Sequence, residues 1–136
     1  MPAASPADPG FDVVVLGAGL NSLNLTIAFH QQYAMRCTTV VRVPVAMNER
    51  TVTSDLLTLG ADASDDDMRD ALVDLAARRP AGRPALLLTN ADSLVDFIDS
   101  YREDLAPHYL LAQVDAQLLA RLADKATFAE ICEGLG

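Results

Sequence analysis

The sequence predicts an α/β domain with a mainly parallel, doubly wound sheet and helices on both faces. Short apolar segments alternate with segments of helical periodicity along most of the chain. The apolar segments, such as VVVL and ALLL, carry hydrophobic side chains at consecutive positions, as strands do when helices cover both faces. A glycine turn directly after the first of them leads into a helix, which is the opening of a Rossmann-like βαβ unit.

The first βαβ unit is predicted between residues 11 and 43. FDVVVLG forms a strand, and CTTVVRV at 37–43 forms a second, which Pro44 ends or leaves at a sheet edge. For residues 44–63 we predict a loop that carries one short strand. The helix between the two strands presents its apolar residues at helical spacing: Leu20, Leu23, Ile27 and Ala34.

A second helix is predicted to begin after Ser64. Its hydroxyl can accept from the first amides of the helix, Asp67 stands at the reciprocal capping-box position, and Asp65–Asp67 favour the positive end of the helix dipole. Arg78 and Arg79 close this helix before an exposed turn and the buried-type strand PALLLTN. The residues predicted to face the core are Met68, Leu72 and Leu75.

The last third of the chain predicts further alternating elements. One amphipathic helix presents Leu94, Ile98, Tyr101 and Leu105 on its apolar side. A strand follows within residues 107–113, and Asp115 then caps a brief helix that contains Leu118, Leu119 and Leu122. Asp124 caps a final helix, whose core-facing residues are predicted to be Phe128, Ile131 and Cys132.

Composition and charge narrow the class of protein. The chain of 136 residues fits one domain with a real core, and its net charge of −9 opposes binding to nucleic acid. Hydrophobic residues make up 51% of the sequence, but no apolar run approaches the roughly 20 residues that span a bilayer. We therefore expect a cytoplasmic protein with neither nucleic acid nor a membrane as partner, and we treat residues 1–10 as a disordered leader.

Most residue types that carry chemistry have a structural explanation here. Cys37 and Cys132 lie far apart without metal-binding spacing, so we expect two reduced, partly buried thiols. Neither His30 nor His108 has a carboxylate or cysteine at catalytic spacing. The carboxylates of DASDDD are accounted for by the helix start, and we expect no metal site.

The glycine turn leaves three interpretations open. Gly17 and Gly19 match the first glycines of the dinucleotide fingerprint, with Ser22 in place of the third. The second strand lacks the acidic residue that would bind a ribose, although Arg42 could hold the 2′-phosphate of NADP. The turn could instead serve packing alone, or bind an anion or substrate group with Asn21 and Ser22 as side-chain donors.

Positive charge is distributed unusually, and its distribution directs attention to the last helix. The ten basic residues are nine arginines and a single lysine, Lys125, within LADKATFAEICEGLG. We interpret its ammonium as a contact to a nucleotide phosphate, through a charge-assisted hydrogen bond.

The order of these features resembles the N-terminal, pre-ATP-grasp domain of an ATP-grasp ligase. Asp124, Lys125 and Phe128 match the Asp-Lys-x-x-Phe type of motif that opens the segment joining this domain to the ATP-binding lobes. The opening VLGAGLNSLNL and the close ICEGLG are similar to the carboxylate–amine ligase branch, which includes D-aspartate ligases.

The resemblance implies a domain at residues 11–123, and a helix at 124–136 that leads into an ATP-grasp portion beyond Gly136. It implies an enzyme that uses ATP and Mg²⁺ to join an amino-acid or peptide carboxylate to an amine, with Lys125 on an ATP phosphate and no catalytic residue in this chain. Alone, the chain is expected to be inactive and to hold no cofactor tightly. Two alternatives stay open: an NAD(P)- or adenine-nucleotide-sensing Rossmann module, and a packing or dimerisation domain without ligand. We also keep a homodimer as an open arrangement.

Overall fold

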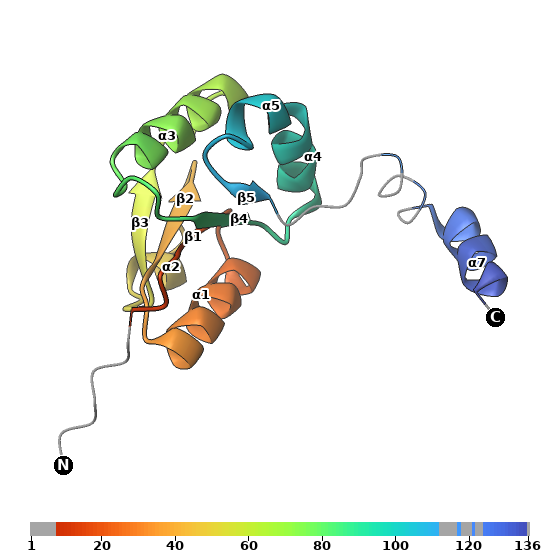
Figure 1. Ribbon diagram of the computed structural model, residues 1–136, viewed down its shortest axis with the longest axis horizontal. Helices are drawn as coiled ribbons and strands as arrows, with labels where there is room; N and C mark the ends of the chain where they lie inside the picture. The colour runs from red at the N-terminus through yellow and green to blue at the C-terminus, as the bar shows by residue number, and fades with distance from the viewer. Residues whose placement is uncertain (1–7, 112–116, 118–120, 122–123, 136) are drawn as a thin grey trace, which may run out of the picture.

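The computed structural model describes residues 8–111, 117, 121 and 124–135 (Figure 1). Strands and helices alternate along most of the described residues, as the sequence predicts, except that two helices follow each other between residues 92 and 105. The strands are β1 (Asp12–Leu16), β2 (Cys37–Val41), β3 (Ser54–Thr58), β4 (Ala85–Leu88) and β5 (Leu110–Leu111). The helices are α1 (Leu20–Tyr33), α2 (Ala46–Glu49), α3 (Asp65–Ala77), α4 (Asp92–Ser100), α5 (Arg102–Leu105) and α7 (Lys125–Gly134).

All five strands are parallel and lie in the order β3-β2-β1-β4-β5. The chain builds outward from β1 to β3 on one side and then crosses over to add β4 and β5 on the other. This order confirms the predicted doubly wound α/β fold. It also creates a switch point beside β1, where the connections from neighbouring strands leave in opposite directions, and ligands of such sheets bind outside the carboxyl ends of the strands there.

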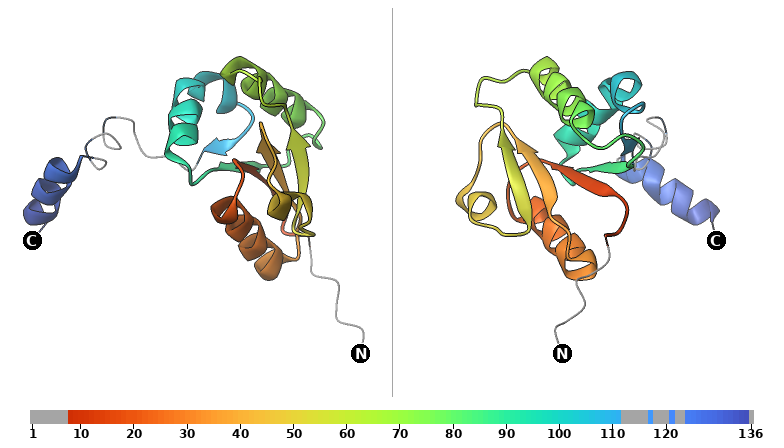
Figure 2. Two further views of the ribbon diagram at one scale, coloured as in Figure 1. Left: turned by 180° about the vertical axis from the view of Figure 1, so that it is seen from behind. Right: turned by 60° about the vertical axis from the view of Figure 1, so that its left-hand side comes forward.

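The helices cover both faces of the sheet, with α1 on one face and α3, α4 and α5 on the other (Figures 1 and 2). Alternate residues of β1 divide between the two faces. Val14 and Leu16 belong to the larger core, together with Met68 and Leu72 of α3. Val13 and Val15 belong to the smaller core, against which Leu25 and Phe29 of α1 pack. The consecutive valines of β1 are therefore apolar because both faces are buried.

The capping box predicted at the start of α3 is confirmed. The Asp67 N–H donates to Ser64 Oγ at 3.1 Å, and the Ser64 N–H donates to Asp67 Oδ2 at 2.8 Å. Hydrogen bonds from the Ser64 backbone and side chain lower the pKa of Asp67. The N-cap role of Asp124 is also confirmed, because its carboxylate accepts from the Thr127 N–H at 2.8 Å.

Several predicted elements are shorter or broken. The second strand ends at Val41 rather than at residue 43, and the side chain of the next residue, Arg42, bonds the start of α3. The segment before β3 contains a short helix, α2, that the sequence did not predict. Of the strand predicted within 107–113, the described part contains only Leu110–Leu111, and the helix predicted after Asp115 lies outside the described residues.

The amphipathic helix predicted from Leu94 to Leu105 is interrupted at Tyr101. Its ψ angle of 22° separates α4 from α5. The Tyr101 hydroxyl donates to Asp66 of α3 at 2.9 Å, and Leu105 is fully buried in the larger core. Contacts with α3 therefore place this break, and the apolar periodicity did not reveal it.

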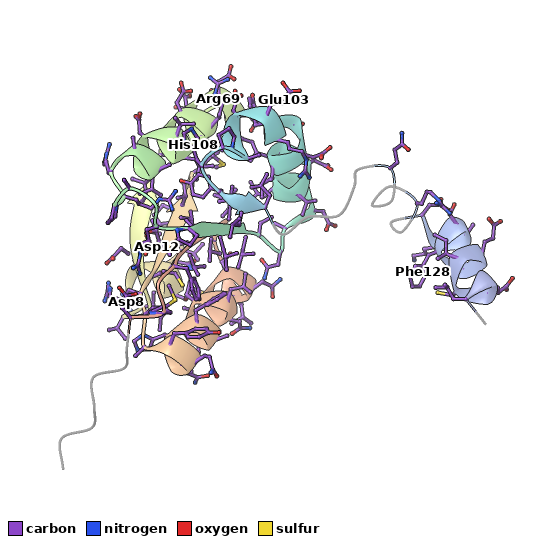
Figure 3. The ribbon with its side chains drawn as sticks, in the orientation of Figure 1. Asp8, Asp12, Arg69, Glu103, His108 and Phe128 are labelled. Carbon is purple, nitrogen blue, oxygen red and sulfur yellow. The ribbon has the colours of Figure 1, made fainter. Side chains whose placement is uncertain are left out.

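The packing predicted for the last helix is wrong. Helix α7 has no buried residue, and Phe128 is 49% exposed (Figure 3). Cys132 is likewise exposed, whereas Cys37 is buried in the smaller core. Burial raises the pKa of the Cys37 thiol to about 11. The apolar spacing in α7 thus creates an apolar side, but this side does not face the core of the sheet.

Arg83 ties the start of the chain to the amino end of the sheet. Its Nη1 and Nη2 donate to both carboxylate oxygens of Asp8 at 2.8 and 2.7 Å, and its Nε donates to Asp12 at 2.8 Å. Figure 3 shows both aspartates where β1 begins. Residues 8–10, which we assigned to the leader, are therefore joined to the fold. Chiefly because of Arg83, the pKa of Asp8 falls from its ordinary value of 3.8 to about 2.

This ion pair predicts an acid-sensitive contribution to stability. A carboxylate with a lowered pKa in the folded state stabilises the fold above its unfolded pKa, and the contribution disappears as the pH falls through the folded pKa. The difference in unfolding free energy between wild type and Asp8→Asn should be constant above about pH 5 and should shrink between pH 4 and 2. Urea unfolding at several pH values measures it, with Asp96→Asn as an exposed control. A difference that does not change with pH would contradict the assignment.

Candidate functional site

The candidate site begins at the turn between β1 and α1, at the carboxyl end of the central strand. Gly17 and Gly19 have φ angles of 101° and 104°, which favour glycine. A Cβ on Gly17 would also lie 2.9 Å from Leu94 Cδ1 of α4, whereas a Cβ on Gly19 would meet open space. Gly17 therefore serves both backbone conformation and packing, and Gly19 serves conformation.

Asn48 of α2 completes this turn. Its side chain is 2% exposed, and its Oδ1 accepts a hydrogen bond from the Gly19 N–H at 2.8 Å. Its buried Nδ2 has no hydrogen-bond partner among the described residues. The Gly17 N–H is also engaged, since it donates to the Val40 carbonyl at 3.0 Å. Both glycine amides of the turn thus have acceptors from within the chain, and an anion here would have to use the next amides of α1.

Asn21 and Ser22 stand in different surroundings on the first turn of α1. Asn21 is exposed, so its amide is accessible to a ligand. Ser22 is 2% exposed, and its Oγ lies 3.5 Å from the Cβ position of Gly17. The small Ser22 side chain therefore packs beneath the turn, which is the structural use that a fingerprint glycine has at this place.

Thr89, at the end of β4, borders the same edge of the sheet across the switch point. Its hydroxyl donates to the Leu16 carbonyl at 3.1 Å and accepts from the Ala91 N–H at 3.2 Å. This side chain holds the end of β4 against the end of β1, and the exposed Asn90 follows it. Sequence reasoning missed Asn48, Thr89 and Asn90, although a polar pair directly after an apolar strand was a signal for the last two.

Arg42, the candidate contact for a cofactor 2′-phosphate, is bound within the chain. Its Nε donates to the Ala63 carbonyl at 2.8 Å, and its Nη2 forms an ion pair with Asp65. These contacts connect the end of β2 to the start of α3. The NADP interpretation relied on this guanidinium, which instead has a structural role.

Lys125 lies in α7, and the described residues show no contact between it and the glycine turn. Its side chain is exposed at the first position of the helix. The neighbouring Asp124 bonds the Thr127 amide, which lowers the pKa of that carboxyl. The structure thus brings together Gly17, Gly19, Asn21 and Ser22, but places Lys125 on a separate element.

The described residues offer neither a metal-binding cluster nor a membrane-spanning helix. They contain no group of three or more His, Cys, Asp or Glu side chains that could hold a metal ion. Within the same part of the chain, no helix is long and apolar enough to cross a membrane. His30 bonds the Met35 carbonyl through Nδ1 at 3.0 Å, at the end of α1.

Comparison with known proteins gives a distant likeness. A D-aspartate ligase from Enterococcus faecium (strain Aus0004) is 21% identical to this chain over 125 residues. The aligned part covers 90% of this chain but 30% of that ligase, so the chain spans less than a third of its relative. No family model and no solved structure matches.

Proposed function

We propose that this chain contributes the N-terminal domain of an ATP-dependent carboxylate–amine ligase. The observation that carries the proposal is the likeness to a D-aspartate ligase over 90% of the chain. The Rossmann-like sheet and the Asp124-Lys125-x-x-Phe128 segment support it, because this combination resembles the front of an ATP-grasp enzyme. In such a ligase, ATP phosphorylates a carboxylate, and an amine then displaces phosphate from the acyl phosphate to form an amide.

The described residues do not suffice to hold ATP and Mg²⁺. They offer one exposed ammonium, Lys125, and no carboxylate cluster for a metal ion. A charge-assisted hydrogen bond contributes about 1.5–3 kcal/mol, whereas micromolar binding requires about 8 kcal/mol. We therefore assign the nucleotide and metal sites to a further portion of the proposed enzyme, and we expect no catalytic residue in this domain.

Within this proposal, the domain faces the substrate through the switch-point edge of its sheet. The turn at Gly17 and the residues after β4 meet at this edge, and exposed Asn21 and Asn90 supply neutral polar groups. Neutral amides can orient a carboxylate or an amine of an amino acid by hydrogen bonds. The proposed substrate class is an amino acid or short peptide.

Trapping the acyl phosphate tests this function in the product of the complete gene. With ATP, Mg²⁺ and hydroxylamine, a carboxylate that becomes activated yields a hydroxamate and ADP. We expect hydroxamate from at least one member of a panel of D- and L-amino acids, beginning with D-aspartate because the relative is a D-aspartate ligase. Omission of either ATP or the amino acid is the control. Failure of the whole panel to yield hydroxamate or amino-acid-dependent ADP would contradict the proposal.

A further inference from the structure

A cavity of about 460 Å³ lies at the amino ends of the strands, opposite the carboxyl ends where the glycine turn lies. One wall is the turn between α3 and β4, and the other is the segment between α5 and β5. Ala85 and Leu110, which line it, are the first residues of β4 and β5, so the cavity lies at the amino ends of the strands. Its volume falls within the range of about 300–1,000 Å³ that is usual for small-molecule sites.

Two arginines line this cavity, and their surroundings differ. Arg83 is matched by the carboxylates of Asp8 and Asp12, and also donates to the Phe11 carbonyl at 3.1 Å. Arg79 donates through Nη2 to the His108 carbonyl at 2.9 Å, and its Cζ lies 4.8 Å from the centre of the Tyr109 ring. The chain therefore supplies Arg83 with two carboxylates, while no described carboxylate forms an ion pair with Arg79.

The guanidinium of Arg79 retains donors without an acceptor. Its Nε and Nη1 are buried and have no hydrogen-bond partner among the described residues. A guanidinium stays charged at every physiological pH, so its N–H groups require acceptors when water is excluded. The ring of Tyr109 compensates part of the charge through a cation–π contact, and the Tyr109 hydroxyl, which donates to the Leu72 carbonyl, also interacts with the guanidinium.

The cavity lining defines the chemistry of a suitable ligand. Apart from the arginines, the walls contain several small or apolar side chains, including alanines, prolines and Leu110. The net charge of −9 disfavours a ligand with several negative charges. A ligand with one anionic group beside Arg79 and a short apolar body against the other walls matches this lining and carries little negative charge. We propose that this cavity binds a small organic carboxylate, which accepts hydrogen bonds from the Arg79 guanidinium once this side chain turns its buried donors toward the cavity. The proposal is independent of the ligase function.

NMR titration of the 136-residue chain tests this site. Propionate and N-acetylalanine are the carboxylate probes, and inorganic phosphate is the anion without an apolar body. We expect saturable shifts in the amides of residues 79–84 and 106–110 with both carboxylates, and weaker binding of phosphate. Arg79→Gln should weaken the carboxylates by about ten-fold or more, because a charge-assisted hydrogen bond is lost. Arg78→Gln is the matched control, since Arg78 is exposed and does not line the cavity.

Three outcomes would overturn the site. The first is the absence of saturable shifts up to about 100 mM carboxylate, a concentration at which even very weak sites begin to fill. The second is equal affinity of the carboxylates for the wild type and for Arg79→Gln. The third is tighter binding of phosphate than of either carboxylate. If Arg79→Gln fails to fold, Arg79→Lys replaces it, and the wild-type titrations still decide whether the cavity binds. Shifts confined to residues 17–22 would place binding at the glycine turn, and they count under the first outcome because the amides of the cavity do not shift.

Discussion

Replacing Gly17 by valine is expected to lower the free energy of unfolding by about 2–5 kcal/mol. Two effects contribute. The φ angle of 101° strains any β-branched residue, and strain of this kind costs about 1–3 kcal/mol. In addition, the new Cβ would lie 2.9 Å from Leu94 Cδ1, so that α4 or its side chain must move. Urea unfolding followed by circular dichroism measures the loss.

Two further variants separate the strain from the contact. Gly60 has a φ angle of 111° with nothing within 4 Å of its Cβ position, so Gly60→Val should show the strain alone. Leu94→Ala by itself removes packing against the larger core, so the two variants are compared as a cycle. Gly17→Val should cost less in the Leu94→Ala background than in the wild type, and this recovery is expected because the methyl group in contact is removed. Equal losses at Gly17 and Gly60, with no recovery by Leu94→Ala, would show that the turn does not depend on its packing against α4.

Replacing Lys125 by alanine in the proposed complete ligase is expected to lower kcat/KM for ATP by about ten- to hundred-fold. The reason is the loss of one charge-assisted hydrogen bond to a phosphate, which contributes about 1.5–3 kcal/mol. Because the side chain of Lys125 is exposed, it contributes little to the stability of the fold. The thermal midpoint of the domain should therefore not change. Initial rates of ADP release at varied ATP concentration measure the effect.

Two controls distinguish the effect of the positive charge of Lys125 from the effect of its position in the chain. Lys125→Arg keeps the positive charge and should retain most of the ATP dependence. Arg121→Ala removes another exposed positive charge nearby in the sequence, and should leave kcat/KM for ATP close to that of the wild type. An unchanged kcat/KM in Lys125→Ala would remove the nucleotide role from this residue, while leaving the hydroxamate test of the ligase function unaffected.

Local features of the sequence predicted much of the fold. The capping box formed at Ser64 and Asp67, three residues apart, because both bonds depend on the backbone of one helical turn. The valines of β1 predicted a strand buried on both faces, and they lie in two separate cores. The residues of the glycine turn stay together because they adjoin in the chain. The helical spacing of apolar residues was misleading in α7, because these residues are not buried in the core.

What the sequence alone determined is the type and order of most elements, the helix caps and the position of the glycine turn. The assembled fold set the hydrogen-bond partners that lie far apart in the chain: Asn48 for Gly19, 29 residues away, and Asp8 for Arg83, 75 residues away. It also decided that Arg42 is bound within the chain while donors of Arg79 remain unmatched. The cause of this difference is the distance along the chain over which each effect acts. Propensity, periodicity and capping act within a few residues, whereas the burial and pairing of a polar group depend on segments that meet only after the sheet is assembled.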